Sequence, residues 1–298
     1  PFVNMSGDAE NEYFSDGMSA EVLNALGRKV RLPVIARSSS FQFKGQNKGI
    51  KEIGRLLGVT HVLEGSVRKA GNSIRMTVHL IDAATGGMIW AGAYQRELND
   101  IFSLQSDIAE NIAEHIDVVL DGTIAPLPAV LQTADHIELR HTANLEAYDL
   151  YLKGMQMLTS DRPPLIEQAV GYFDLAIALD PDYADAWAAK GCTLGMLGWM
   201  GSGSSRIPAS VYPDAIAALR KALEIEPGNA FATGWLGVLL MENDFKWAEG
   251  MRLLEESLAR NPNDAVLLTQ YGFYLDLMHL EGAEEVLDRA YRLDPFNI

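Results

Sequence analysis

The sequence predicts an α+β domain, a mixed sheet with packed helices, followed by an all-α solenoid of helix pairs. Between residues 60 and 95 apolar and polar side chains alternate, which is typical of half-buried strands, whereas most other apolar residues recur with the helical period. A short word ending in proline also recurs at nearly regular intervals after residue 178. We therefore expect an α+β domain over residues 1–120, a linker over 121–144 and helical repeats over 145–298.

The amino-terminal part is expected to contain a shortened strand and then a helix. The chain opens at Pro1 to Val3 directly before a loop, so we expect the first strand of the sheet to be mostly missing. The helix after Ser15 and Asp16, either of which is a suitable cap, is expected to end near Gly27.

Two further elements are expected before the alternating region. Leu32 to Ala36 is a short apolar run of strand type. Residues 50–57 repeat with helical period and stop at Gly58, a residue that commonly ends helices.

The alternating region predicts three antiparallel strands and a helix. Turns at residues 70–72 and 85–87 separate the strands, which are expected over 60–68, 74–80 and 88–95. The apolar residues from Ile101 to Leu120 form one helical stripe, started by Asn99 or Asp100. The sheet is therefore expected to be mixed, with helices packed on it.

Several words of the first domain resemble a bacterial module found at the amino terminus of TolB and in FlgO-like proteins. The words lie at residues 1–8 (PFVNMSGD), 12–17 (EYFSDG), 36–41 (ARSSSF), 63–68 (LEGSVR) and 80–86 (LIDAATG). The resemblance covers roughly residues 1–120. It implies a module that stands before tetratricopeptide repeats and behind either a winged-helix DNA-binding domain, as in CadC-type regulators, or a class III adenylate or guanylate cyclase.

The first domain offers no clear catalytic, cofactor or metal site. Asp8 and Asp16 are explained by turn formation and helix capping, because no phosphate-binding glycine motif or carboxylate cluster accompanies them. His61 and His79 lack a third ligand for zinc. The serines at 38–40 are expected to lie in an exposed loop. We therefore predict no catalytic residue, cofactor or metal.

The second half is organised by a recurring word that ends in proline. The word occurs at residues 178–181 (ALDP), 224–227 (EIEP), 259–262 (ARNP) and 292–295 (RLDP). Its intervals of 46, 35 and 33 residues approach the 34-residue period of two antiparallel helices, which identifies a resemblance to tetratricopeptide repeats. The long interval is attributed to an inserted loop rich in Gly and Ser over 198–212. Four repeats are expected.

Small residues are expected where the two helices of a repeat come close. Four glycines fall at corresponding positions of the first helices, at Gly154, Gly191, Gly237 and Gly272. Alanine or another small residue faces them from the second helices.

The repeat resemblance implies that the first helix of each pair lines a concave groove. The candidate partner groove comprises Tyr148, Tyr151, Met155, Leu158, Met196, Phe231, Val238, Met241 and Phe273. The same alignment also places Glu242, Val266 and Asp276 on this face. Such an apolar lining suits an apolar or amphipathic polypeptide segment. A capping helix of the same protein is the alternative occupant.

Charge and hydropathy exclude two classes of function for this segment. The net charge is −16, and residues 123–298 alone contain 12 Lys and Arg against 25 Asp and Glu. Nucleic-acid binding requires a basic surface, so it is not expected here. No apolar stretch approaches the roughly 20 residues needed to span a bilayer.

These observations predict a non-catalytic sensory or protein-interaction region of a bacterial signalling or transcriptional regulator. The alternatives are the regulatory carboxyl-terminal region of a class III adenylate or guanylate cyclase, and an adaptor for envelope or flagellar assembly. The compartment stays open: periplasmic if a membrane span lies upstream, otherwise cytoplasmic. The sequence does not determine the oligomeric state.

Overall fold

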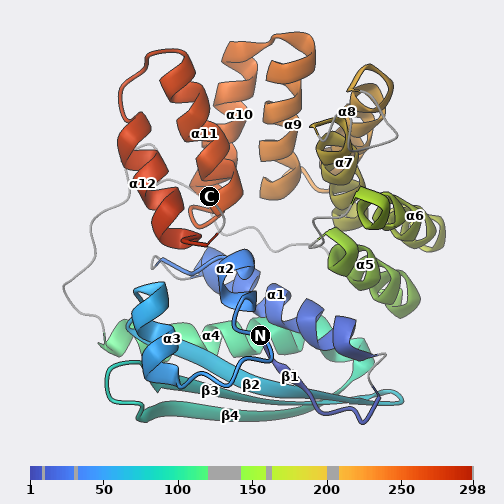
Figure 1. Cartoon of the computed structure of the whole chain (residues 1–298). Helices are drawn as coiled ribbons and strands as arrows, with labels where there is room; N and C mark the ends of the chain where they lie inside the picture. Colours follow the sequence, from blue (N-terminus) through green and yellow to red (C-terminus); the bar gives the residue numbers. More distant parts are fainter. Residues whose placement is uncertain (9–10, 30–32, 120–141, 159–162, 200–207, 297–298) are drawn as a thin grey trace. The chain divides into compact units, whose positions relative to one another are not determined.

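The computed structural model describes residues 1–8, 11–29, 33–119, 142–158, 163–199, 208–296 (Figure 1). The chain divides into two compact units, which are described separately below. The first, here the α/β unit, contains residues 1–126 together with 288–298. The second, the repeat unit, contains residues 127–287. The division thus assigns residues 288–298 to the α/β unit, whereas the sequence places them in the fourth repeat.

The α/β unit is built on a four-stranded mixed sheet. Strand β1 (Val3–Asn4) pairs in parallel with β2 (His61–Ala70), and β3 (Ser73–Asp82) and β4 (Met88–Glu97) continue the sheet antiparallel in the order β1-β2-β3-β4. Gly71, with a φ of 59°, lies in the turn from β2 to β3. The predicted mixed sheet and its three-stranded meander are confirmed.

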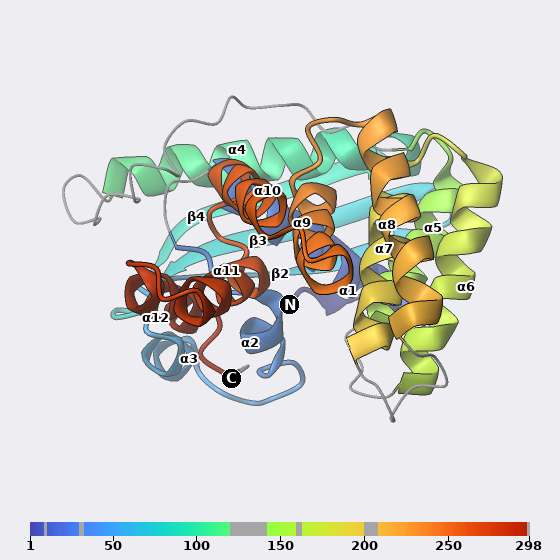
Figure 2. The same cartoon turned by 90° about the horizontal axis from the view of Figure 1, so that it is seen from above.

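Helices cover one face of this sheet. Helices α1 (Glu12–Lys29) and α4 (Ile101–Val119) contact each other and lie over the same face (Figures 1 and 2). The 3-10 turn η2 (Leu98–Asp100) leads into α4. Helix α3 (Ile50–Leu57) contacts β2 and ends at Gly58, whose φ of 67° is the left-handed conformation of a helix C-cap.

The alternation along β3 separates the buried face from the open one. Ile74, Met76, Val78 and Leu80 are buried. The intervening positions are polar, and Thr77 joins Ser66 of β2 through a hydroxyl pair at 2.7 Å. An antiparallel sheet with one solvated face shows this period-two pattern.

Three expectations for the first domain are wrong. Residues 33–36 are not a strand, and they precede the short helix α2 (Arg37–Phe41). The serines of α2 do not lie in an exposed loop, because Ser39 is fully buried. Ser15 and Asp16 are not caps, because α1 begins at Glu12 and places both in its buried interior, where Asp16 accepts a bond from Lys44 at 2.5 Å.

The described repeat helices form four consecutive pairs. Their bounds are α5 (Leu145–Leu158), α6 (Pro163–Leu179), α7 (Ala184–Trp199), α8 (Pro208–Ile225), α9 (Ala230–Asp244), α10 (Trp247–Arg260), α11 (Ala265–Leu277) and α12 (Ala283–Leu293). Within the repeat unit, each helix from α5 to α11 packs on its neighbour in sequence. The predicted series of helix pairs is confirmed.

The segments that connect the repeat helices have other bounds than the sequence predicts. The predicted loop over 198–212 is shorter, because α7 continues to Trp199 and α8 already begins at Pro208. Residues 200–207 lie outside the described chain, as does most of the predicted linker, residues 120–141. The last linker residues instead start the first repeat, because Asn144 accepts a bond from the Ala147 amide at 3.2 Å, as an N-cap does.

Glycines bring the two helices of each pair close together, as predicted. A Cβ at Gly154 would come within 2.5 Å of the Phe173 ring, and one at Gly237 within 2.7 Å of the Gly250 carbonyl. Contacts this short are not tolerated by real Cβ atoms, so the glycines allow the observed packing.

Candidate polypeptide-binding surface

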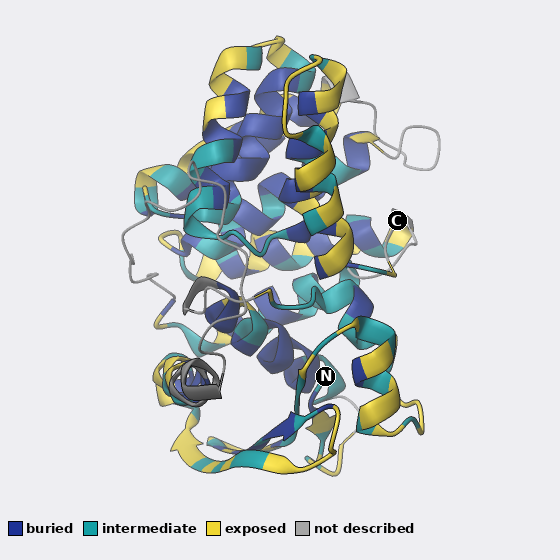
Figure 3. Ribbon diagram, turned by 90° about the vertical axis from the view of Figure 1, so that its left-hand side faces the viewer, coloured by how far each residue is buried: buried dark blue, intermediate teal, exposed yellow. Residues whose placement is uncertain are grey.

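The first helices of the repeats form the interior of the repeat unit. Helices α5, α7, α9 and α11 contact one another in that order, and α5, α7 and α9 also pack on the second helix of their own repeat. Helices α7 and α9 are consequently buried over almost their whole length. Figure 3 shows the buried stretches of the fold in dark blue. A helix that is apolar on all sides is expected to be buried in this way.

Burial separates the nine predicted groove residues into two sets. Four are buried, namely Tyr148, Tyr151, Val238 and Met241. The Tyr151 ring lies 5.3 Å from Tyr183 and 6.0 Å from Phe173, which explains its burial. In this structure these four side chains contribute to the packed interior and leave little exposed surface.

The other five predicted residues keep exposed area. Met155, Leu158, Met196 and Phe231 are half-buried, and Phe273 is 53% exposed. That these five act together as a groove stays a prediction.

The clearest exposed apolar surface follows helix α11. Val266, Phe273 and Leu277 are 42%, 53% and 53% exposed. Their spacings of seven and four residues place them in one line along the helix, which we call the α11 stripe. An uncovered line of large apolar side chains is a recurrent feature of polypeptide-binding surfaces.

A single carboxylate connects the helices next to this stripe. Glu242 of α9 accepts hydrogen bonds from the Trp199 indole of α7, the Tyr212 hydroxyl of α8 at 3.1 Å and the Tyr274 hydroxyl of α11 at 2.9 Å. We call these four residues the Glu242 cluster. The cluster joins three successive repeats through one side chain, so it fixes the positions of their helices relative to one another.

Burial dominates the electrostatics of the Glu242 cluster. Removal from water raises the pKa of Glu242, although its three hydrogen bonds act in the opposite direction. Burial and the nearby carboxylate likewise raise the pKa values of Tyr212 and Tyr274, so both hydroxyls remain donors. The cluster is therefore a set of three donors around one acceptor.

Ring contacts connect the Glu242 cluster to the α11 stripe. Phe273 and Tyr274 are edge to face with centroids 5.4 Å apart, and Trp247 meets Tyr274 at 5.9 Å. Trp199 is 43% exposed and lies 6.0 Å from Trp235. The surface near the stripe is thus aromatic.

Sequence reasoning missed part of this surface. It did not identify Trp199, Tyr212, Tyr274 or Leu277. Two of them had a detectable signal, because Trp199 follows the predicted Met196 by three residues and Leu277 follows Phe273 by four, which is the same helix face. Tyr212 and Tyr274 lie off the predicted face, and only the fold brings their hydroxyls to Glu242.

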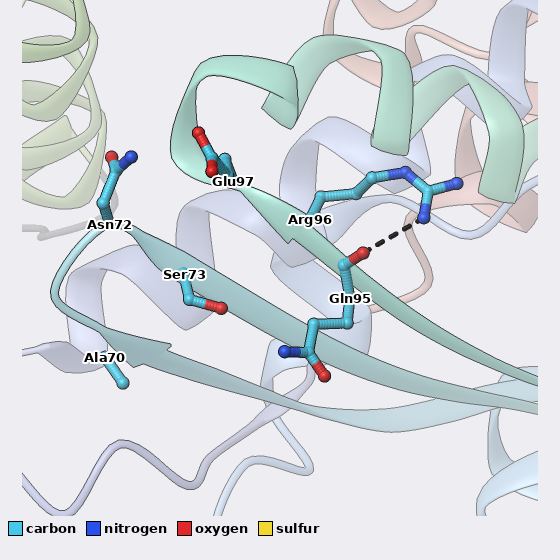
Figure 4. A pocket seen from close by; sticks show the side chains of 6 residues that line it. All are labelled: Ala70, Asn72, Ser73, Gln95, Arg96 and Glu97. Carbon is cyan, nitrogen blue, oxygen red and sulfur yellow. Dashed lines mark hydrogen bonds between the residues drawn. The ribbon is translucent and has the colours of Figure 1, made fainter.

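A surface hollow lies at one end of the sheet. It is lined by Ala70, Asn72, Ser73, Gln95, Arg96 and Glu97 (Figure 4). The Arg96 guanidinium donates to the Gln95 carbonyl at 3.1 Å and lies 3.6 Å from the Asp107 carboxylate. The positive charge of Arg96 is therefore already paired.

Among the described residues, neither a metal-binding cluster nor a membrane-spanning helix is found. These residues contain no group of three or more His, Cys, Asp or Glu side chains placed to hold a metal ion. Cys192 is fully buried, and burial raises the pKa of its thiol, which disfavours the reactive thiolate. Across the same parts of the chain, no helix is both long and apolar enough to cross a membrane.

A protein of known sequence is similar to part of this chain. No protein-family model matches the chain. A protein named putative adenylate cyclase 3, from Rhizobium meliloti strain 1021, is 37% identical over 189 residues, which is 63% of this chain. The chain spans about a third of that relative's length, 31%.

Solved structures with some similarity include repeat proteins. MamA from Desulfovibrio magneticus RS-1 matches 49% of this chain and 75% of its own at 20% identity, with a TM-score of 0.36. The carboxyl-terminal part of a TPR repeat-containing protein from Cytophaga hutchinsonii matches 67% of this chain and 83% of its own at 14% identity, with a TM-score of 0.25. The chain is thus similar in sequence to part of a protein named as a cyclase.

Proposed function

We propose that this chain is a non-catalytic, polypeptide-binding region of a bacterial signalling protein, and that its helical repeats carry the binding surface. The α11 stripe is the observation that supports this function best. Its three large apolar side chains are exposed in line, beside the aromatic rings of the Glu242 cluster.

The chemistry of the stripe favours an amphipathic partner. Helix α11 contains no Lys or Arg that could pair with a peptide carboxylate, and Asp276 is exposed beside Leu277. The acidic excess of residues 123–298 adds a negative field around the surface. A segment with an apolar face and basic flanks would therefore be complementary in both respects.

The test uses a defined set of ligands. Peptides selected from a displayed library against the full chain would be synthesised, and their affinity would be measured by fluorescence anisotropy. We expect Phe273→Glu with Leu277→Glu to weaken binding by about 10-fold or more, because two apolar contacts become buried charges.

The matched control lies on a second helix. Leu175 of α6 is 55% exposed, so Leu175→Glu makes the same chemical change away from the stripe and is expected to leave affinity unchanged. Equal affinities of the double variant and the control would contradict the proposal.

A second candidate rests on the sequence relative. The match to a protein named putative adenylate cyclase 3 supports a regulatory region that controls a cyclase elsewhere in the same polypeptide. In a longer protein containing this chain, the double Glu variant would then change cyclic nucleotide output, whereas unchanged output would limit the region to binding. The transcriptional and envelope alternatives rest on the resemblance of residues 1–120 alone.

A further inference from the structure

Within the α/β unit, residues 293–296 lie against helix α2 and its flanks. The Ala36 amide donates to the Leu293 carbonyl at 2.7 Å. The hydroxyls of Ser38 and Ser39 both donate to the Asp294 carboxylate, Ser39 at 2.6 Å. These contacts join residues that are more than 250 positions apart in the sequence.

The contact continues past Asp294. The Phe296 amide donates to the Ser39 hydroxyl at 2.9 Å, so this hydroxyl is donor and acceptor at once. The Phe296 ring meets Phe43 edge to face, with centroids 5.9 Å apart. The backbone of residues 293–296, the Asp294 carboxylate and the Phe296 ring thus each contact a group between residues 36 and 43.

Burial distinguishes this contact from a chance surface encounter. Ser39 is fully buried and Asp294 is 5% exposed. A carboxylate so removed from water needs hydrogen-bond donors, and the two serine hydroxyls supply them.

The first repeat shows the same arrangement with a local partner. Asp180 ends that repeat, as Asp294 ends the fourth, and its carboxylate accepts from the Thr142 hydroxyl. Thr142 stands three residues before α5, and the corresponding residue before α11 is Pro262, which has no hydroxyl. Ser38 and Ser39 therefore provide for Asp294 the kind of donor that Thr142 provides for Asp180.

We propose that residues 36–43 form a docking site for a short acidic segment of the type Leu-Asp-Pro-Phe, and that residues 293–296 of the same chain occupy it. The docked segment holds α2 in place and is part of the folded α/β unit. The site acts as a latch that a negative charge on Ser38 opens, because that charge repels Asp294.

The test measures hydrogen exchange of the α2 amides in the full chain. Asp294→Asn and the pair Ser38→Ala with Ser39→Ala each remove charge-assisted hydrogen bonds. We expect either change to speed exchange over residues 37–44 by about 10-fold or more. The two changes combined should have less than the sum of their separate effects, because both weaken the bonds between the serine hydroxyls and Asp294.

Matched variants separate the latch from general destabilisation. Asp180→Asn makes the same change in the first repeat and should leave α2 exchange unaltered. Ser38→Glu should speed exchange more than Ser38→Ala does. If circular dichroism shows that Asp294→Asn is no longer folded, hydrogen exchange of the α2 amides is compared in the single variant Ser38→Ala instead.

Two results would overturn the proposal. One is unchanged α2 exchange in Ser38→Ala and in Ser38→Glu. The other is full additivity between the serine changes and Asp294→Asn, since additive effects mean that the groups do not interact.

Discussion

The α/β unit and the repeat unit are each stabilised by a different kind of internal contact. The α/β unit depends on residues far apart in sequence: Val3 pairs with Ser66 in the sheet, and α1 packs on α4. The repeat unit depends on neighbours, because each of its helices packs on the next in sequence or on the corresponding helix of the next repeat.

This difference has consequences for stability. A stack of repeats is stabilised by local interfaces, so damage to one repeat is felt there and in its neighbours. In a sheet formed by long-range pairing, damage to one strand affects the stability of the whole sheet more. Four substitutions in the repeat unit test that contrast, from the largest expected effect to the smallest.

The largest effect is expected in the core of the first repeat. Phe173 of α6 is fully buried, and its ring lies against Tyr151 and the backbone of Gly154. Phe173→Ala should lower the free energy of unfolding of the repeat unit by about 3–5 kcal/mol, because it leaves a cavity. Denaturant unfolding would measure the loss.

Hydrogen exchange would locate that loss. We expect faster exchange in α5 and α6 and unchanged exchange in β3. The control Leu175→Ala, at an exposed position of the same helix, should change stability by less than about 0.5 kcal/mol. Equal loss of protection in β3 would show that the units are not independent.

A smaller effect is expected where two repeat helices approach each other. Gly237→Ala places a Cβ 2.7 Å from the Gly250 carbonyl, so the backbones of α9 and α10 must separate. We expect a cost of about 1–3 kcal/mol in thermal or denaturant unfolding.

A glycine in open space provides the opposite case. A Cβ at Gly171 of α6 would meet nothing within 4 Å, so Gly171→Ala should stabilise the chain by up to about 1 kcal/mol through helix propensity. Similar effects at both glycines would show that close packing does not govern the choice of residue.

The smallest effect concerns pH. Because the pKa of Glu242 is raised in the folded state above its ordinary value of 4.5, the folded protein binds this proton more readily than the unfolded chain. The resulting stability is fully present below about pH 4.5 and is lost as pH rises through the folded pKa.

Glu242→Gln cannot titrate and isolates this contribution. The stability of the parent relative to Glu242→Gln should therefore increase as pH falls from 7 toward 4.5, in thermal melts at matched ionic strength. A constant difference across that range would show that the cluster does not couple protonation to folding.

Local sequence patterns predicted most elements and few contacts. The period of residues 50–57 and the glycine at 58 predicted α3 and its end, and the alternation from Ile74 to Leu80 predicted the buried face of β3. The run at 32–36 was misread because an apolar extended segment before a helix has the composition of a strand. Of that run, residues 33–36 lie outside the sheet.

Helical spacing describes the exposure of the predicted groove residues only in part, because spacing is a local property. Helical spacing placed Phe273 and Val266 on one face, and the structure leaves both exposed. It also placed Tyr151 and Val238 on the repeat groove, where they are buried. Spacing gives the direction of a side chain on its own helix and says nothing about which other helix covers it.

The sequence by itself determined the series of helix pairs, the meander and the acidic character of the second half, because period, turn residues and charge are local properties. Only the tertiary structure decided where three groups of side chains meet. Glu242 receives donors from three other helices, Ser38 and Ser39 bind Asp294, and the tyrosines of α5 enter the repeat core. Such contacts depend on the distance between elements in the fold, which the local pattern of residues does not encode.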